Sequence, residues 1–193
     1  MKKSISVAAL FALTVSFALP AHAQSPEPLD LNIFVQLAQS QTRDLINWKV
    51  GDSMNYNVSL GFMGNGTMVK NVASEEGGNI WLHQDINIMN QKQTVDVLMQ
   101  RSDGKILKVL QNGQEAQIPD SKIEVVSTNF DHITVPAGTF DCMHIVANTD
   151  QAKGLEVWGN PDMTAMDGSL KEIVPTQFGM TMTLELTAFH KVQ

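Results

Sequence analysis

The stretch Phe178–Ala188, with the sequence FGMTMTLELTA, decides the fold class. Its apolar residues fall at every second position, and Thr181, Thr183, Glu185 and Thr187 occupy positions between them. Because successive side chains of a β-strand point to opposite faces, this pattern predicts a strand with one buried and one solvated face. A register shift of one residue would expose the whole apolar set to water, so the pairing of this strand is strongly specified.

The same period of two recurs from Trp48 onward. It predicts a strand over 54–62 and further strands near 68–73, 80–88, 94–99, 105–110, 122–135, 139–147, 155–158 and 169–174. Asn65-Gly66 is a turn signal. Asp103-Gly104 and Asn112-Gly113 are strong hairpin signals, because both dipeptides tolerate a positive φ. We therefore predict a mainly β fold, a curved antiparallel meander or half-barrel of about nine to eleven strands.

The N-terminal residues have the organisation of a secretory signal peptide. Lys2 and Lys3 precede an apolar run over 5–19, and Ala21-His22-Ala23 supplies a small-x-small cleavage site. We predict cleavage after Ala23, a flexible leader over 24–29 and one β-rich domain over 30–193 that begins with an amphipathic helix at 31–42. The expected location is the periplasm or the extracellular medium, with no transmembrane segment and, because no cysteine lies near the cleavage site, no lipid anchor.

Charge and cysteine content restrict the function further. The signal peptide holds two of the 13 Lys+Arg residues and none of the 20 Asp+Glu residues, so the mature chain has a formal charge of −9. Such a surface repels nucleic acid, which we exclude as a partner. Cys142 is the one cysteine, so an intramolecular disulfide is impossible, and we predict that its thiol is buried and inert.

No set of residues has the spacing of a catalytic or metal site. The mature chain contains four histidines but no H-E-x-x-H motif, and there is no G-x-S-x-G motif. Cys142 and His144 share a face of their predicted strand, where the buried-residue interpretation outweighs metal binding because no second ligand pair lies nearby. We therefore expect no catalytic residues, no metal, no cofactor and no enzymatic activity.

Methionine is unusually frequent, with 10 of the 11 methionines in the mature chain. Met180 and Met182 form an M-x-M pair, and Met163 and Met166 lie in a predicted loop. Thioethers bind Cu(I), so copper binding through Met and His is one alternative. The other interpretation is an adaptable apolar surface, since Met fills irregular gaps.

One segment resembles a known family. The run from Ile133 to Cys142, ITVPAGTFDC, and the later VWGNP at 157–161 resemble exported bacterial proteins that carry a V-P-A-G-T-F signature and form a domain family of unknown function. The signature has a structural explanation: Pro136 sets a turn, Gly138 permits a positive φ and Phe140 re-enters the sheet. The turn signature comprises Val135, Pro136, Ala137, Gly138, Thr139 and Phe140. The resemblance implies a fold similar to LolA-type periplasmic lipoprotein carriers and no catalytic residues.

Two function hypotheses follow. The first is a non-catalytic carrier that binds a lipid, acyl chain or other apolar ligand, with the 31–42 helix as a lid. Its binding face would consist of Tyr56, Val58, Leu60, Phe62, Met180, Met182, Leu184 and Leu186. The second is a structural or interaction module of the cell envelope, in which the same residues form a filled core and the partner is an envelope protein. The sequence alone does not separate them, because a core and a cavity use the same residue types.

Overall fold

The computed structural model describes residues 46–118, 123–149, 153–175 and 180–193. The signal peptide, the leader and the 31–42 helix predicted above lie outside these residues. The described elements are β1 (Ser53–Ser59), the 3-10 turn η1 (Gly61–Met63), β2 (Asn65–Glu76), β3 (Asn79–Ile88), β4 (Gln91–Gln100), β5 (Ile106–Gln111), β6 (Gln114–Ala116), β7 (Ile123–Val135), β8 (Gly138–Thr149), β9 (Lys153–Gly159), β10 (Ser169–Pro175) and β11 (Thr181–His190).

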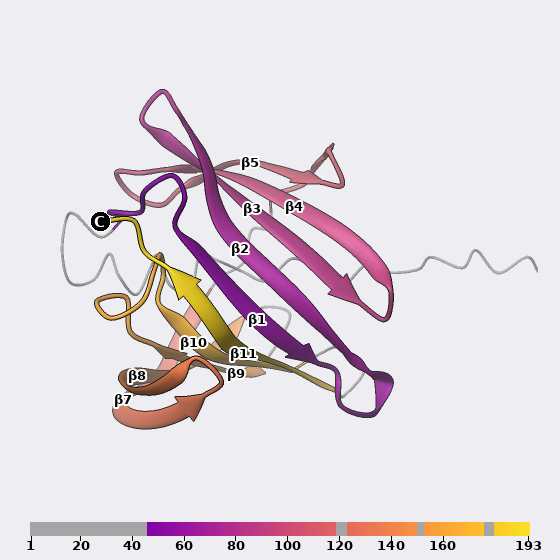
Figure 1. The fold of residues 1–193 in the computed structure, drawn as a ribbon, viewed down its shortest axis with the longest axis vertical. Helices are drawn as coiled ribbons and strands as arrows, with labels where there is room; N and C mark the ends of the chain where they lie inside the picture. Colours follow the sequence, from indigo (N-terminus) through magenta and orange to yellow (C-terminus); the bar gives the residue numbers. More distant parts are fainter. Residues whose placement is uncertain (1–45, 119–122, 150–152, 176–179) are drawn as a thin grey trace, which may run out of the picture.

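The strands form one antiparallel sheet in the order β6-β5-β4-β3-β2-β1-β11-β10-β9-β8-β7. The predicted mainly β class and the strand number are confirmed. The sheet consists of two meanders, one of six strands and one of five, which meet where the first strand pairs with the last. Figure 1 shows these two wings on either side of the β1–β11 pair.

The connection between the edge strands explains why the sheet is strongly curved. Six residues, 117–122, join β6 at one edge to β7 at the other. In a flat sheet the ten spacings between these strands would separate them by about 48 Å. A fully extended connection of this length reaches only about 25 Å. The wings must therefore bend toward each other, although the edges do not pair and the sheet stays open.

The core is formed by the apolar residues that alternate with polar ones along the strands. Met54, Tyr56 and Val58 of β1 lie on the same face as Leu184 and Leu186 of β11, and all five are buried. Registers place Tyr56 opposite Leu186 and Val58 opposite Leu184. We call the face of the sheet that carries these residues the inner face. Within the described residues, no helix has the length and hydropathy needed to cross a membrane.

Three details of the prediction are wrong. Asn65-Gly66, predicted as a turn, is the start of β2. The strand predicted over 54–62 ends at Ser59, and the chain turns through η1, where Gly61 and Gly64 have positive φ. Ala188 is exposed rather than buried, because the pairing of β1 with β11 shifts register between Asn55 and Tyr56. The extra residue in β11, Thr187, reverses the alternation beyond it.

The turn signature joins β7 to β8 and docks on the centre of the sheet. β10 pairs with β11 only as far as the Lys171–Glu185 pair, which leaves the next stretch of β11 without a neighbour on that side. The backbone N–H of Ala137 donates to the carbonyl of Leu186 at 3.0 Å and so occupies part of this gap. Phe140 is buried and contacts Phe189 edge-on, with ring centroids 6.5 Å apart.

Candidate functional site

The structure brings most of the predicted binding face together. Tyr56, Val58, Met182, Leu184 and Leu186 are all buried in one apolar cluster on the inner face. Leu60 packs against this cluster and is half-buried, and Met180, just before β11, is half-buried as well.

Phe62 is the exception among the predicted face residues. It lies in η1, and 92% of its surface is exposed. The reason is that the strand ends three residues earlier, so the alternation that placed Phe62 on the inner face no longer applies.

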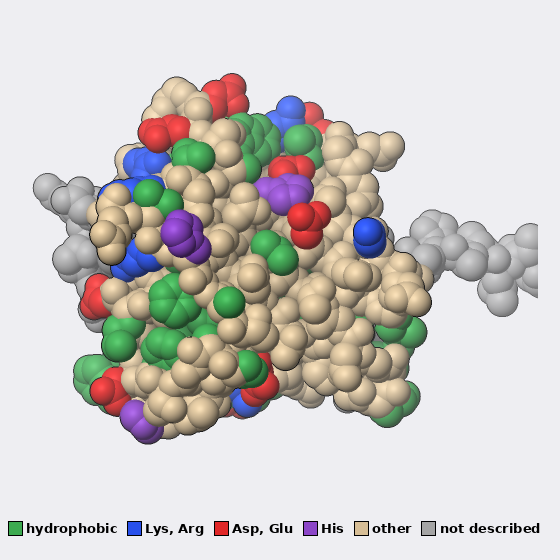
Figure 2. Space-filling view, viewed as in Figure 1, with side chains coloured by type: hydrophobic (Ala, Val, Ile, Leu, Met, Phe, Trp, Pro, Cys, Tyr) green, Lys and Arg blue, Asp and Glu red, His purple; other side chains and the backbone are tan. Residues whose placement is uncertain are grey.

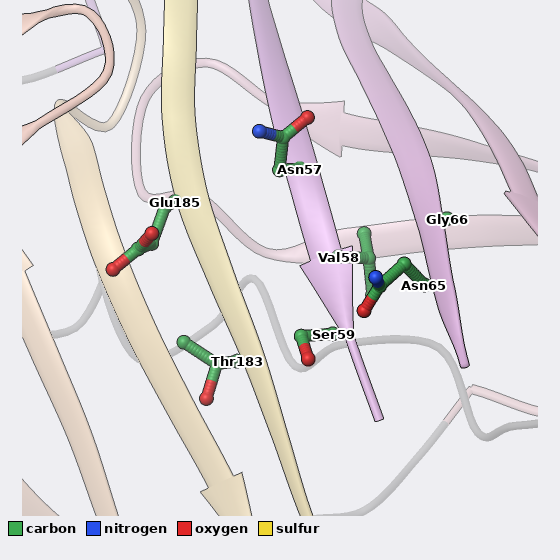
Figure 3. A pocket seen from close by; sticks show the side chains of 7 residues that line it. All are labelled: Asn57, Val58, Ser59, Asn65, Gly66, Thr183 and Glu185. Atoms are coloured by element: carbon green, nitrogen blue, oxygen red, sulfur yellow. The ribbon is translucent and has the colours of Figure 1, made fainter. Parts of the chain in front are cut away.

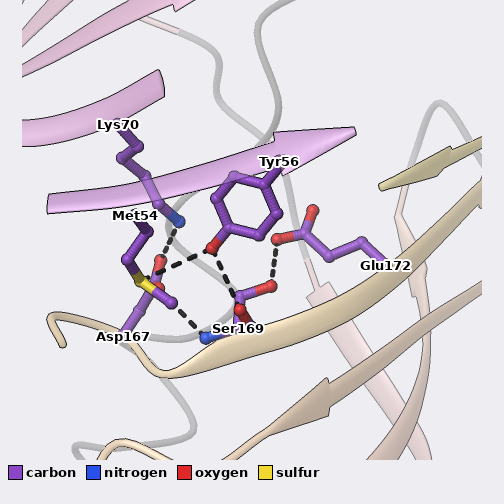
Figure 4. A network of polar contacts seen from close by, with 6 residues as sticks. All are labelled: Met54, Tyr56, Lys70, Asp167, Ser169 and Glu172. Atoms are coloured by element: carbon purple, nitrogen blue, oxygen red, sulfur yellow. Dashed lines mark hydrogen bonds and ion pairs between the residues drawn. The ribbon is translucent and has the colours of Figure 1, made fainter. Parts of the chain in front are cut away.

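The inner face also holds a buried polar network that the sequence did not reveal (Figure 4). Lys70 Nζ of β2 forms an ion pair of 2.6 Å with Asp167 Oδ2, and both side chains are 1% exposed. The Ser169 hydroxyl donates to a carboxylate oxygen of Glu172 in β10. The Tyr56 hydroxyl donates to the backbone carbonyl of Ser169 at 3.0 Å, and the Lys70 ammonium lies 5.4 Å from the centre of the Tyr56 ring.

This network anchors the loop between β9 and β10. The loop residues Thr164, Ala165, Met166 and Asp167 are buried, although the segment has no regular secondary structure. Burying an unpaired ammonium and carboxylate is costly, so the pairing between β2 and this loop fixes the position of the loop. One signal of it was present in the sequence: Lys70 lies between Met68 and Val72 at an inward position of an alternating strand.

Burial controls the ionisation of two groups in the network. Removal from water raises the pKa of Glu172, and this effect outweighs the nearby Lys70 ammonium, which lowers it. Burial, with the charges of Asp167 and Glu172, also raises the pKa of Tyr56 well above its ordinary value. Folding therefore disfavours the ionised form of Glu172, which lies near the Lys70–Asp167 ion pair.

A pH prediction follows for Glu172→Gln. An acid whose pKa is raised by folding contributes stability below its ordinary pKa and loses it as the pH rises through the raised value. The neutral amide does not ionise, so we expect this variant to be at least as stable as wild type at about pH 8 and to show a flatter pH dependence. Urea unfolding at about pH 4 and pH 8 measures it. A variant that loses stability relative to wild type at the higher pH would show that the ionised carboxylate is the form the fold requires.

Two amide side chains on the inner face have buried atoms without a hydrogen-bond partner in the part of the chain that the structure describes. Gln84 of β3 is 1% exposed, and both its Nε2 and its Oε1 are unpaired. Gln93 of β4 has an unpaired buried Nε2. An unsatisfied buried polar group costs about 1–3 kcal/mol, so two neighbouring ones require an explanation.

The opposite, outer face has a polar pocket of about 360 Å³ at the junction of the two wings (Figure 3). Its lining includes Asn57 and Ser59 of β1 and Thr183 and Glu185 of β11, the positions that alternate with the apolar ones, together with Val58 and the start of β2 at Asn65 and Gly66. Glu185 is already paired with Lys171 at 2.9 Å. The polar side chains of the lining are half-buried or exposed, so the pocket is an open depression rather than a shielded site.

Three described histidines each pair with a carboxylate. His83 contacts Asp96 at 2.6 Å and Asp85 at 3.2 Å, and the hydrogen bond with Asp96 is the main cause of its raised pKa. His132 pairs with Asp141 at 2.7 Å. His144 pairs with Glu156 at 2.9 Å and stacks on Trp158 with ring centroids 4.1 Å apart. In the part of the chain that the structure describes, no three His, Cys, Asp or Glu side chains are arranged to hold a metal ion.

The predicted methionine loop divides between two environments. Met163 is 56% exposed, whereas Met166 is buried and has φ +48. Met182 belongs to the inner-face cluster. Copper binding through Met and His stays a prediction, and the positions of these methionines do not support it further.

The Cys142 thiol is buried, as predicted, and lies 3.6 Å from the carbonyl oxygen of Asp131. Burial raises the pKa of this thiol, and the carboxylates of Asp131 and Asp141 act in the same direction. Since the thiolate is the reactive form, we expect slow labelling of Cys142 by a maleimide in the native protein and fast labelling in urea. Mass spectrometry of timed samples measures the rate, and native labelling as fast as that of the unfolded chain would contradict the assignment.

Comparison with known proteins gives a limited result. No protein-family model matches the sequence, and no significant match is found among curated proteins. A crystal structure of MucB is similar over 88% of this chain and 61% of its own, with 13% sequence identity and a TM-score of 0.41. A crystal structure of MucB in complex with MucA(peri) is similar over 82% of this chain and 55% of its own, with 13% identity and a TM-score of 0.44.

The chain therefore spans less than two thirds of the MucB chains to which it is similar. Membership of the family with the V-P-A-G-T-F signature stays a prediction, as does the similarity to LolA-type carriers.

Proposed function

We propose that this protein is a non-catalytic binding protein of the cell envelope that holds a hydrophobic ligand against the inner face of its curved sheet. The observation that supports this proposal best is the composition of that face. It is apolar and rich in methionine, with Met54, Met68, Met99 and Met182 in a single cluster. Apolar surfaces with a few polar groups are typical of small-molecule sites, and methionine lets such a surface adapt to its ligand.

The predicted signal peptide supports an envelope location. The buried charged groups support a binding role rather than catalysis. Lys70 and Asp167 form an ion pair, and Glu172 accepts a hydrogen bond from Ser169. Each of these polar groups therefore has a structural partner within the network. A catalytic site would instead need a nucleophile and a base that converge on a common point.

An apolar fluorescent probe tests this proposal. We expect saturable binding of such a probe to the mature protein, with weaker binding to Met182→Lys. Thr183→Lys is the matched control, because Thr183 lies on the other face of β11 and should leave binding unchanged. Circular dichroism reports whether each variant folds. Absence of saturable binding to the unmodified protein would overturn the proposal whatever the variants do.

The alternative, an interaction module, is favoured by one specific observation. Phe62, Met63 and Met89 are exposed on the two loops at the same end of the sheet. The segments 59–67 and 87–91, which comprise these loops and the adjoining strand ends, contain no charged residue. Figure 2 shows few charged side chains in this region, at the lower right of the view. An uncharged apolar projection suits contact with an apolar area on an envelope protein.

Site-specific photo-crosslinking in intact cells tests the alternative. A crosslinker at position 62 should give a discrete adduct if this end of the sheet is an interface. The control is position 130, since Phe130 is equally exposed, at 90%, but lies on the edge strand β7. Equal labelling at both positions would argue against an interface.

A further inference from the structure

The unpaired amides of Gln84 and Gln93 are neighbours on the inner face. Gln84 pairs in register with Val95 of β4, and Gln93 lies two residues before Val95 on the same face. Diagonal neighbours of this kind are within reach of long side chains. Together the two glutamines present two amide N–H₂ groups and one carbonyl oxygen without partners.

The charges around these amides are balanced. Lys70 lies directly across from Gln84 in the β2–β3 register, and Asp167 neutralises its ammonium at 2.6 Å. Glu172 lies in the same buried network, where burial raises its pKa and so disfavours its ionised form. A second full charge placed here would be desolvated without a partner of opposite sign, at a cost that an uncharged polar group avoids.

We infer that the inner face binds an uncharged amphiphile, whose apolar body lies on the methionine-rich cluster and whose polar group is held by Gln84 and Gln93. The amide N–H₂ groups donate to a carbonyl oxygen of the ligand, and the Gln84 carbonyl accepts from a hydroxyl or amide N–H. Esters with free hydroxyl groups and neutral amides share this chemistry, whereas an ionised fatty acid has no donor and carries a full charge. This inference rests on the proposed function and specifies its ligand class.

Competition with the apolar probe tests this preference. Decanoylglycerol and decanoate carry chains of equal length and differ in the charge of the head group. At about pH 8, where decanoate is ionised, we expect decanoylglycerol to displace the probe at roughly tenfold lower concentration, the equivalent of one lost hydrogen-bonded group. Gln84→Met should weaken the binding of decanoylglycerol about tenfold. It should change the affinity for the apolar probe by less than about twofold.

The variant is suited to this purpose. Methionine replaces glutamine at similar volume and removes polar atoms that have no partner, so Gln84→Met should fold and be at least as stable as wild type. Gln91→Met is the control, because Gln91 is an exposed residue of β4, the strand that carries Gln93. This variant should not change the binding of the probe or of decanoylglycerol.

The outcomes are separable. If the probe does not bind, the proposed function fails. If the probe binds but decanoate competes as well as decanoylglycerol, or if Gln84→Met does not affect decanoylglycerol, the carrier role stands and the assignment of the glutamines is overturned. A neutral amide, N-(2-hydroxyethyl)decanamide, should behave like decanoylglycerol, and this comparison distinguishes recognition of the shared carbonyl and donor from recognition of the glycerol group.

Discussion

We expect Lys70→Met to lower the free energy of unfolding by about 3–5 kcal/mol, because it leaves the carboxylate of Asp167 buried without its cation. Both side chains are 1% exposed, so water cannot replace the lost ammonium. The loop between β9 and β10 should detach from β2 as a consequence. Urea unfolding monitored by tryptophan fluorescence measures the change.

The double variant Lys70→Met/Asp167→Asn is the control. The asparagine side chain retains an oxygen that can accept from the backbone N–H of Ser169, as Asp167 does, and the buried charge is gone. We expect this variant to recover at least half of the lost stability, since removal of both charges also removes the desolvation cost. A single variant that loses less than about 1 kcal/mol, the range of an exposed pair, would show that the ion pair is not buried in solution.

Gly168→Ala is the second change with a large expected effect. Gly168 has φ +75, and a Cβ atom at this position would lie 2.2 Å from the backbone nitrogen of Pro161 and 2.5 Å from the carbonyl carbon of Asn160. The variant forces alanine into the left-handed backbone region. Its Cβ also clashes with backbone atoms, which cannot move aside as the end of a flexible side chain can. We expect a loss of about 2–5 kcal/mol.

Gly154→Ala separates these two contributions. Gly154 has φ +74, almost the same as Gly168, but no atom of the described residues lies within 4 Å of the Cβ position. Its substitution should therefore cost only the backbone term, about 1–2 kcal/mol. Equal losses for the two variants in thermal or urea unfolding would mean that the loop can move away from Gly168, and would contradict the tight contact between residues 160–161 and 168.

The strands were predictable because the alternation is local. The alternation of β11 alone placed Met182, Leu184 and Leu186 on one face. The loop that holds Met163 and Met166 was also predicted. Phe62 and Ala188 show where this reasoning ends. A turn that begins at Leu60 and a register shift opposite Tyr56 are set by pairing with other strands, which the alternation of a single segment does not contain.

The polar part of the site was less accessible from the sequence. Lys70 and Asp167 are 97 residues apart, and Glu172 pairs with Ser169 only because that short segment is folded into the interior. The hydrophobic pattern indicates that Lys70 and Gln84 point inward, but their partners, or the lack of them, depend on which strands become neighbours. The order of the wings, with β1 beside β11, supplies that information.

Native mass spectrometry of the protein, gently isolated from the periplasm of cells that export it, tests the central claim most directly. We predict a mature protein that begins at Gln24 and carries a co-purifying apolar molecule with an uncharged head group. This adduct should be lost from Met182→Lys and reduced in Gln84→Met. A bare mature mass, together with no binding of an added apolar probe, would contradict the carrier account and leave the inner face as a filled core.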